Sequence, residues 1–182
     1  MFAAGLVATL ASVAVSRMEI ALDDLRTAGA TRYVAGRFQR ARMEAFARNA
    51  DVALRFTANG SSFVYAMYVD SNRNGVRSID IQRGLDPRVS TEERLRDQFP
   101  AVDFGTSPGL PPVDASSGSP GSDPIRLGAS NMATFTANGT ASSGSVYIRG
   151  PRNLQYVIRI FGETGKTRIL KFDARRRVWK PL

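Results

Sequence analysis

The chain has 182 residues, enough for one domain with a hydrophobic core, and its formal net charge is +9. It contains no Cys, which excludes disulfides and Cys-ligated metal sites, and no His, which removes the commonest general base and metal ligand. Its glycines fall in turns rather than in a phosphate-binding loop. We therefore expect a protein that is not an enzyme and has no cofactor and no small-molecule substrate.

The first 16 residues form an apolar run that carries no charge before Arg17. The run is shorter than the roughly 20 residues of a membrane-spanning helix, and it lacks the basic start of a signal peptide. A buried core helix is one alternative. We favour the second half of a membrane segment, whose small residues suit close helix packing. The residues expected to mediate membrane insertion and assembly are Phe2, Leu6, Val7, Leu10, Val13 and Val15.

Residues 17–50 are predicted to continue this helix as an amphipathic segment. Its apolar residues recur mostly at spacings of three and four, the period of a helix with one buried face. Gly29 and Gly36 allow a bend, and Asn49 is a plausible helix cap. The residues assigned to the buried face are Ile20, Leu22, Leu25, Ala28, Tyr33, Val34, Phe38, Ala41, Ala45 and Phe46.

Residues 51–182 read as a β-rich head. A hairpin is predicted from strands at 53–57 and 63–69 around Asn59-Gly60, residues 76–82 are expected to pair back, and residues 92–98 to form a helical turn or two. Residues 105–123, rich in Pro, Gly and Ser, are expected to be a long flexible loop. Further strands are predicted at 125–127, 133–136, 144–149, 155–161 and 167–173, before a basic tail at 174–182. The expected fold class is α+β, with the long helix packed against an antiparallel head.

One motif in the head resembles a metal site. Asp70, Asn72 and Asn74, followed by Gly75, match the start of a calcium-binding loop. The twelfth position, which should carry a bidentate carboxylate, is Ile81, and Asp80 lies one residue too early. We therefore interpret the segment as a turn stabilised by Asp70 with Gly75 at positive φ, and keep the metal site as a weak alternative.

Positive charge gathers at the C-terminal end. Residues 149–182 contain ten basic and two acidic side chains, which is nearly all of the net charge. Such a region suits a polyanion or an acidic partner surface, and Tyr156 and Trp179 are possible stacking faces for bases. A solvated or subunit-contacting basic edge is the alternative. The candidate nucleic-acid residues are Lys166, Arg168, Lys171, Arg175, Arg176, Arg177 and Lys180.

Three segments resemble the minor pseudopilin H/FimT-like family of type IV pilin-like proteins. Ala41-Arg-Met-Glu-Ala-Phe-Ala-Arg-Asn49 and Val52-Ala-Leu-Arg-Phe56 are similar to the end of that family's long helix and its first strand. Residues 135–148 resemble its later Phe-x-x-x-Gly-x-x-x-x-Gly segment. Residues 157–168, with the turn Thr164-Gly-Lys-Thr-Arg168, resemble its final strand.

This resemblance implies a pilin-like fold and a concrete role. Such subunits are held in the bacterial inner membrane by a single apolar half-helix, with the head in the periplasm. They then pack helix to helix with other pilins or pseudopilins into a type II secretion pseudopilus or a type IV pilus. FimT-like members linked to DNA uptake suggest DNA as a further partner.

The N-terminus departs from the family pattern. Members begin with a basic leader ending in Gly, then Phe-Thr-Leu-Ile-Glu, whereas Met1-Phe-Ala-Ala-Gly-Leu6 resembles the middle of their membrane segment. We therefore expect the natural reading frame to begin upstream. A free-standing soluble β-domain with a core N-terminal helix is the remaining alternative.

Overall fold

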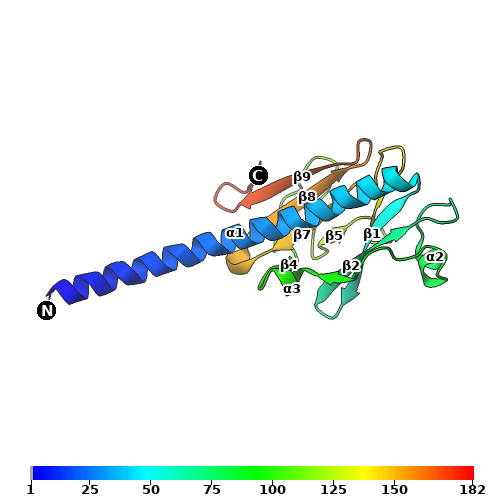
Figure 1. The fold of residues 1–182 in the computed structure, drawn as a ribbon. Helices are drawn as coiled ribbons and strands as arrows, with labels where there is room; N and C mark the ends of the chain where they lie inside the picture. The colour runs from blue at the N-terminus through cyan, green and yellow to red at the C-terminus, as the bar shows by residue number, and fades with distance from the viewer. Residues whose placement is uncertain (1) are drawn as a thin grey trace.

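The computed structural model describes the backbone of residues 2–182 and the side chains of residues 18–182. It has one long helix, α1 (Phe2–Arg48), which projects from a head built of antiparallel strands (Figure 1). The expected α+β architecture of a long helix packed against an antiparallel head is confirmed. The six side chains predicted to mediate assembly, from Phe2 to Val15, lie outside the residues whose side chains are described.

The strands form two sheets. One has the order β3-β2-β1-β6 and the other β10-β9-β8-β7-β4, with β5 also pairing with β7. The elements after α1 are β1 (Val52–Asn59), β2 (Ser62–Val69), α2 (Ser78–Gln82), β3 (Glu93–Arg94), α3 (Leu95–Gln98), β4 (Asp103–Phe104), β5 (Ile125–Arg126), β6 (Met132–Phe135), β7 (Gly144–Arg149), the 3-10 turn η1 (Pro151–Asn153), β8 (Gln155–Phe161), β9 (Lys166–Asp173) and β10 (Val178–Pro181).

The second half of α1 packs against both sheets of the head. Its buried side chains begin at Thr27 and recur every three or four residues, which places them on one face. They share one core with residues of both sheets, and Phe38 lies between the rings of Phe56 and Phe135. The small residues Ala30, Ala35, Ala41 and Ala45 let the strands approach the helix closely.

The predicted buried face of α1 is right in its second half and wrong at both ends. Ala28, Val34, Phe38, Ala41 and Ala45 are buried, and Tyr33 is half-buried against the core. Ile20, Leu22, Leu25 and Phe46 are exposed, because the head covers the helix only from about Thr27 onward and its last turn lies at the edge of the core. The helix passes through Gly29 and Gly36 without a break.

Asn49 terminates α1 by adopting a left-handed backbone conformation. Asn49 has a positive φ of 50°, and its N–H binds the Phe46 carbonyl while the Ala50 N–H binds the Ala45 carbonyl. These two bonds satisfy carbonyls that a helix end otherwise leaves free, the pattern known as the Schellman motif. The chain then enters β1, which pairs with β2 through a tight hairpin whose corner residue Gly60 has φ of 61°. The predicted cap and hairpin are both confirmed.

Two predicted segments of the head differ from the structure. Residues 78–82 form α2 rather than a pairing strand, because Asp80 is the buried side chain while Ile79 stays exposed. The segment from 174 is not a tail, because Val178–Pro181 pairs with β9 as β10. The chain reverses between these two strands at Asp173, whose Oδ1 accepts the N–H groups of Arg175 and Arg176.

The helical turn predicted at 92–98 is shorter than expected. Its first part is β3, which pairs with β2 at Val64 and Tyr65, and only Leu95–Gln98 is helical. Leu95 is fully buried in the core and so fixes this turn against the sheet.

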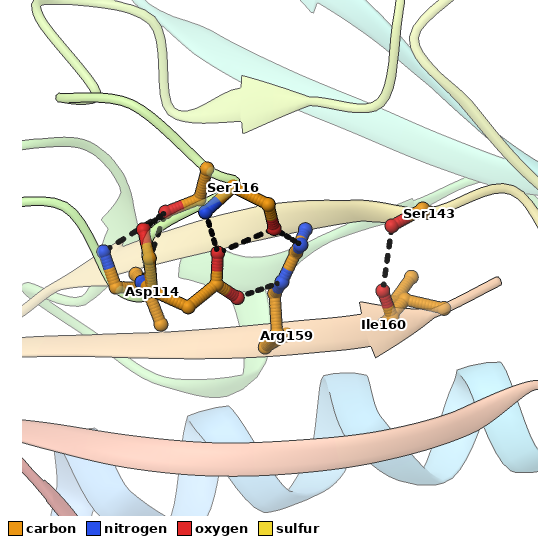
Figure 2. Close-up of polar contacts among 7 residues, drawn as sticks. Asp114, Ser116, Ser143, Arg159 and Ile160 are labelled. Atoms are coloured by element: carbon orange, nitrogen blue, oxygen red, sulfur yellow. Dashed lines mark hydrogen bonds and ion pairs between the residues drawn. The ribbon is translucent and has the colours of Figure 1, made fainter.

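The long segment 105–123 has no helix or strand, as predicted, yet several contacts attach it to the second sheet. The Arg159 Nε atom lies 2.7 Å from Asp114 Oδ2, and the same guanidinium donates to the Ser116 hydroxyl (Figure 2). Leu110 is buried against Tyr147, Val157 and Leu170 in a second, smaller core. The flexibility of this loop stays a prediction.

Candidate functional surfaces

The projecting part of α1 carries the first candidate surface. Met18, Leu22 and Leu25 are exposed and spaced by four and three residues, so they form one apolar stripe on the helix. Ile20 is exposed on another side of the same segment. Within the part of the chain that the structure describes, no helix is both long and apolar enough to cross a membrane.

The C-terminal basic region forms the second candidate surface, on β9, β10 and the turn between them. Lys166 and Arg168 lie near the start of β9, whereas Arg175, Arg176 and Arg177 lie in the turn after its end. An extended strand rises about 3.3 Å per residue, so the two groups are about 25 Å apart. Five of the seven predicted residues therefore divide into two clusters, and Lys171 and Lys180 lie opposite each other on β9 and β10.

Three of the seven basic residues are already engaged within the head. Lys171 Nζ lies 2.6 Å from Asp24 Oδ1 on α1, and Lys180 Nζ lies 2.6 Å from Asp173 Oδ2. Arg177 donates to the Gly109 carbonyl at 3.1 Å, which attaches the C-terminal hairpin to the long loop. Lys166, Arg168, Arg175 and Arg176 form no side-chain ion pair or hydrogen bond with the residues described, and all four are exposed.

The two predicted stacking faces are not open to bases. Tyr156 is fully buried, its hydroxyl donates to Asp24, and burial together with that hydrogen bond raises its pKa. That prediction is wrong, because β8 is an interior strand covered by α1. Trp179 is half-buried against Phe172 and Tyr147, and its indole N–H donates to the Pro111 carbonyl at 3.1 Å. Trp179 therefore secures β10 and the long loop.

A shallow cleft lies between η1 and the β9–β10 hairpin. Its volume is about 520 Å³, and its charged lining residues are Arg152, Lys171, Asp173, Arg175 and Lys180. Arg152 also pairs with Asp23 on α1. Most of the positive charge in this cleft is thus balanced by carboxylates of the same chain, and Arg175 is the lining cation that has no ion-pair partner among the described side chains.

A polar network at the α1–β3 contact was not foreseen from the sequence. Glu93 accepts a hydrogen bond from Tyr33 at 2.6 Å and pairs with Arg37 at 2.7 Å, and Tyr65 also donates to it from β2. Burial and the charge of Glu93 raise the pKa of Tyr65, which keeps the phenol protonated. Gln98 donates to Glu93 as well, at 3.4 Å, and because four donors already occupy its carboxylate, Glu93 joins the helix to the sheet rather than facing a substrate.

The segment that resembles a calcium loop forms the expected turn. Asp70 Oδ1 accepts the N–H groups of Asn72 and Arg73, Oδ2 accepts that of Gly75, and Gly75 has φ of 83°. Asn72 and Asn74 are exposed. Among the described side chains, no three of the His, Cys, Asp or Glu type lie close enough together to hold a metal.

Comparisons with known proteins do not assign the chain to a family. No family model, curated protein or solved structure matches it. Clues to its function come instead from the surfaces of the helix and the head.

Proposed function

We propose that this chain is a non-enzymatic, pilin-like subunit that packs into a filament through α1. The observation that carries the proposal is that the head buries only part of this helix. Its 47 residues make it about 70 Å long, yet buried side chains among residues 18–48 begin only at Thr27. We infer that neighbouring molecules cover its first half, because helices in proteins gain most of their stability from tertiary packing rather than from helix propensity.

The apolar stripe favours other helices as those neighbours. Exposing Met18, Leu22 and Leu25 to water costs about 25 cal/mol per Å² of apolar surface, so covering them stabilises an assembly. The sequence before them, residues 1–16, continues the apolar character without a charge. In this proposal the tip sits in the inner membrane before assembly, the head lies in the periplasm, and both parts of the helix enter a pseudopilus or pilus.

Cysteine crosslinking tests the helix contact, because the chain has no Cys of its own. Leu25→Cys, on the stripe, is compared with Leu85→Cys, on the head; the two leucines are 66% and 46% exposed. With both thiols labelled by a photoactivatable maleimide in native membranes and then irradiated, we expect Leu25→Cys to crosslink to the helix of a second pilin-like subunit, identified by its peptide. Equal crosslinking at both positions, or none at Leu25→Cys, would contradict the proposal.

DNA binding is a second candidate function, favoured by four cations that form no ion pair with the described residues. Lys166, Arg168, Arg175 and Arg176 are exposed at the two ends of β9, where they can reach phosphates without first breaking an ion pair. Lys171 and Lys180 are poorer candidates because Asp24 and Asp173 already neutralise them. A filament subunit can also bind DNA, so the two functions are compatible.

Matched charge removals test the second function. The quadruple variant Lys166→Ala, Arg168→Ala, Arg175→Ala, Arg176→Ala is expected to lose at least about tenfold in DNA affinity and to show a shallower dependence on salt. The quadruple variant Arg73→Ala, Arg77→Ala, Arg83→Ala, Arg94→Ala removes the same number of exposed charges from the other part of the head and serves as control. Equal losses in both variants would mean that binding follows net charge alone and would exclude a specific DNA surface.

A further inference from the structure

Three buried or half-buried carboxylates surround the loop 70–77 between β2 and α2 in addition to Asp70. Asp51 Oδ2 lies beside Gly75, Asp80 contacts Asn74 and Asp86 contacts Arg77. Asp70, Asp80 and Asp86 are each more than nine-tenths buried. We refer to Asp51, Asp70, Asp80 and Asp86 with the loop 70–77 as the acidic loop.

The carboxylates of the acidic loop differ in how many hydrogen bonds they accept. Asp70 accepts three backbone N–H groups, which is a full set of partners for a carboxylate that shapes a turn. Asp86 is only 1% exposed, and its Oδ2 accepts the Arg77 N–H at 3.0 Å, so the carboxylate points at the loop. Its Oδ1 is buried and has no hydrogen-bond partner among the described residues.

The carboxylates of the acidic loop also have no cationic partner among the described side chains. None of the ion pairs among the described side chains involves Asp51, Asp70, Asp80 or Asp86. Arg73 and Arg77 belong to the same loop but are exposed. Buried carboxylates are costly unless a cation or hydrogen-bond donors neutralise them, and Asp86 Oδ1 has neither within the described part of the chain.

We propose that Asp80 and Asp86, together with the amide oxygen of Asn74 and carbonyl oxygens of the loop 70–77, bind Ca²⁺. Asn74 now donates from Nδ2 to Asp80 Oδ2 at 3.1 Å. Reversing this amide places its oxygen next to Asp80, and the two orientations are close to equivalent in shape. An irregular set of oxygen donors suits Ca²⁺ better than Mg²⁺, which demands near-ideal octahedral geometry.

The site differs from an EF-hand in its carboxylates. In an EF-hand the closing carboxylate comes from position 12 of the loop, which here is Ile81. In this chain the second carboxylate comes from Asp86, which follows α2 and accepts the Arg77 N–H of the loop. Two carboxylates completed by neutral oxygens and water predict weak binding, with Kd of about 10⁻⁴ to 10⁻³ M, as in extracellular calcium modules.

The test is a Ca²⁺ titration of the full chain in mild detergent after EDTA treatment, followed by calorimetry and by thermal unfolding. We expect one saturable binding event and a rise in Tm of about 3–5 °C at about 5 mM Ca²⁺, with a smaller rise for Mg²⁺. Asp86→Asn should abolish the Ca²⁺-dependent rise. In EDTA it should be at least as stable as the wild type, because it removes an unpaired buried charge.

Asp80→Asn is the second variant, and Asp97→Asn, which removes an exposed carboxylate from α3, is the matched control. Asp97→Asn should keep the full response to Ca²⁺. The proposal is overturned if the wild type shows neither binding heat nor a Tm shift up to about 10 mM Ca²⁺, roughly ten times the weakest expected Kd. It is also overturned if Asp80→Asn and Asp86→Asn both fold and respond like the wild type.

Discussion

Lys171 on β9 and Asp24 on α1 form an ion pair of 2.6 Å that joins two residues 147 positions apart. The Tyr156 hydroxyl donates to the same carboxylate oxygen at 2.8 Å. A lysine that the sequence places in a nucleic-acid surface thus attaches the helix to the second sheet. The point lies just before Thr27, the first buried residue of α1 among the side chains that are described, so it marks where the helix leaves the head.

This contact predicts how stability depends on pH. Burial raises the Asp24 pKa, but the hydrogen bonds from Lys171 and Tyr156 lower it more, so the folded value lies below the ordinary one. Such a carboxylate stabilises the fold above its unfolded pKa of about 3.9, and this contribution is lost as pH falls through the folded value. Because the pair is partly exposed, the contribution is at most about 1 kcal/mol.

Urea unfolding between about pH 2 and pH 7 checks this prediction, because that range spans the folded and unfolded pKa values of an Asp. Asp24→Asn should lower stability near neutral pH and should flatten the fall in stability below about pH 4. Asp97→Asn is the control and should follow the wild-type curve. A wild-type pH dependence that Asp24→Asn leaves intact would show that other carboxylates dominate acid unfolding.

Two glycines on either side of the helix–sheet contact should respond in opposite ways to alanine. A Cβ at Gly150 would overlap the Thr27 hydroxyl, so Gly150→Ala should destabilise the head by about 1–3 kcal/mol. Gly36 lies in the helix with open space around it, so Gly36→Ala should stabilise by about 0.5–1 kcal/mol. Denaturant unfolding measures both, and Thr27→Ala should rescue part of the loss in Gly150→Ala.

The contact between Asp114 and Arg159 predicts the behaviour of the long loop. Asp114→Ala leaves the Arg159 guanidinium nearly buried without its carboxylate, which should cost about 1–3 kcal/mol and release the loop 105–123. Limited proteolysis should then cut this loop several-fold faster than in the wild type. Ala115→Ser, an exposed change in the same loop, should leave the rate unchanged. Equal rates for Asp114→Ala and the wild type would exclude a restraining role for the pair.

The strands that could be predicted best are those with continuous apolar runs between turn residues. β7 and β8 match their predicted bounds because both are buried strands enclosed by Gly and Pro-rich turns. β10 could not be predicted, since its pairing depends on the Asp173 turn and on Trp179 packing against Phe172. Those contacts are tertiary, and the residues from Arg175 to Pro181 show no alternation of polar and apolar side chains that would predict a strand.

The charge and polarity of the candidate surfaces could be predicted from the sequence. Which groups cover or neutralise their side chains could not. Helical spacing identifies Leu22 and Leu25 as apolar positions, yet spacing alone does not say whether the head or another molecule covers them. Likewise, the cluster of basic residues is plain in the sequence, but the carboxylates that neutralise Lys171 and Lys180 depend on the fold. Asp86 was missed because it lies outside the calcium-loop spacing.

Filament assembly tests the central claim most directly, through one apolar residue on the helix and its counterpart on the head. Leu22 on the stripe of α1 is 46% exposed and Ile79 on α2 is 47% exposed, so Leu22→Glu and Ile79→Glu add the same charge at similarly open sites. The measurement is the fraction of the chain that co-sediments with filaments from cells. We predict at least a tenfold loss for Leu22→Glu and wild-type incorporation for Ile79→Glu. Normal incorporation of Leu22→Glu, or equal losses in both variants, would contradict assembly through the stripe of α1.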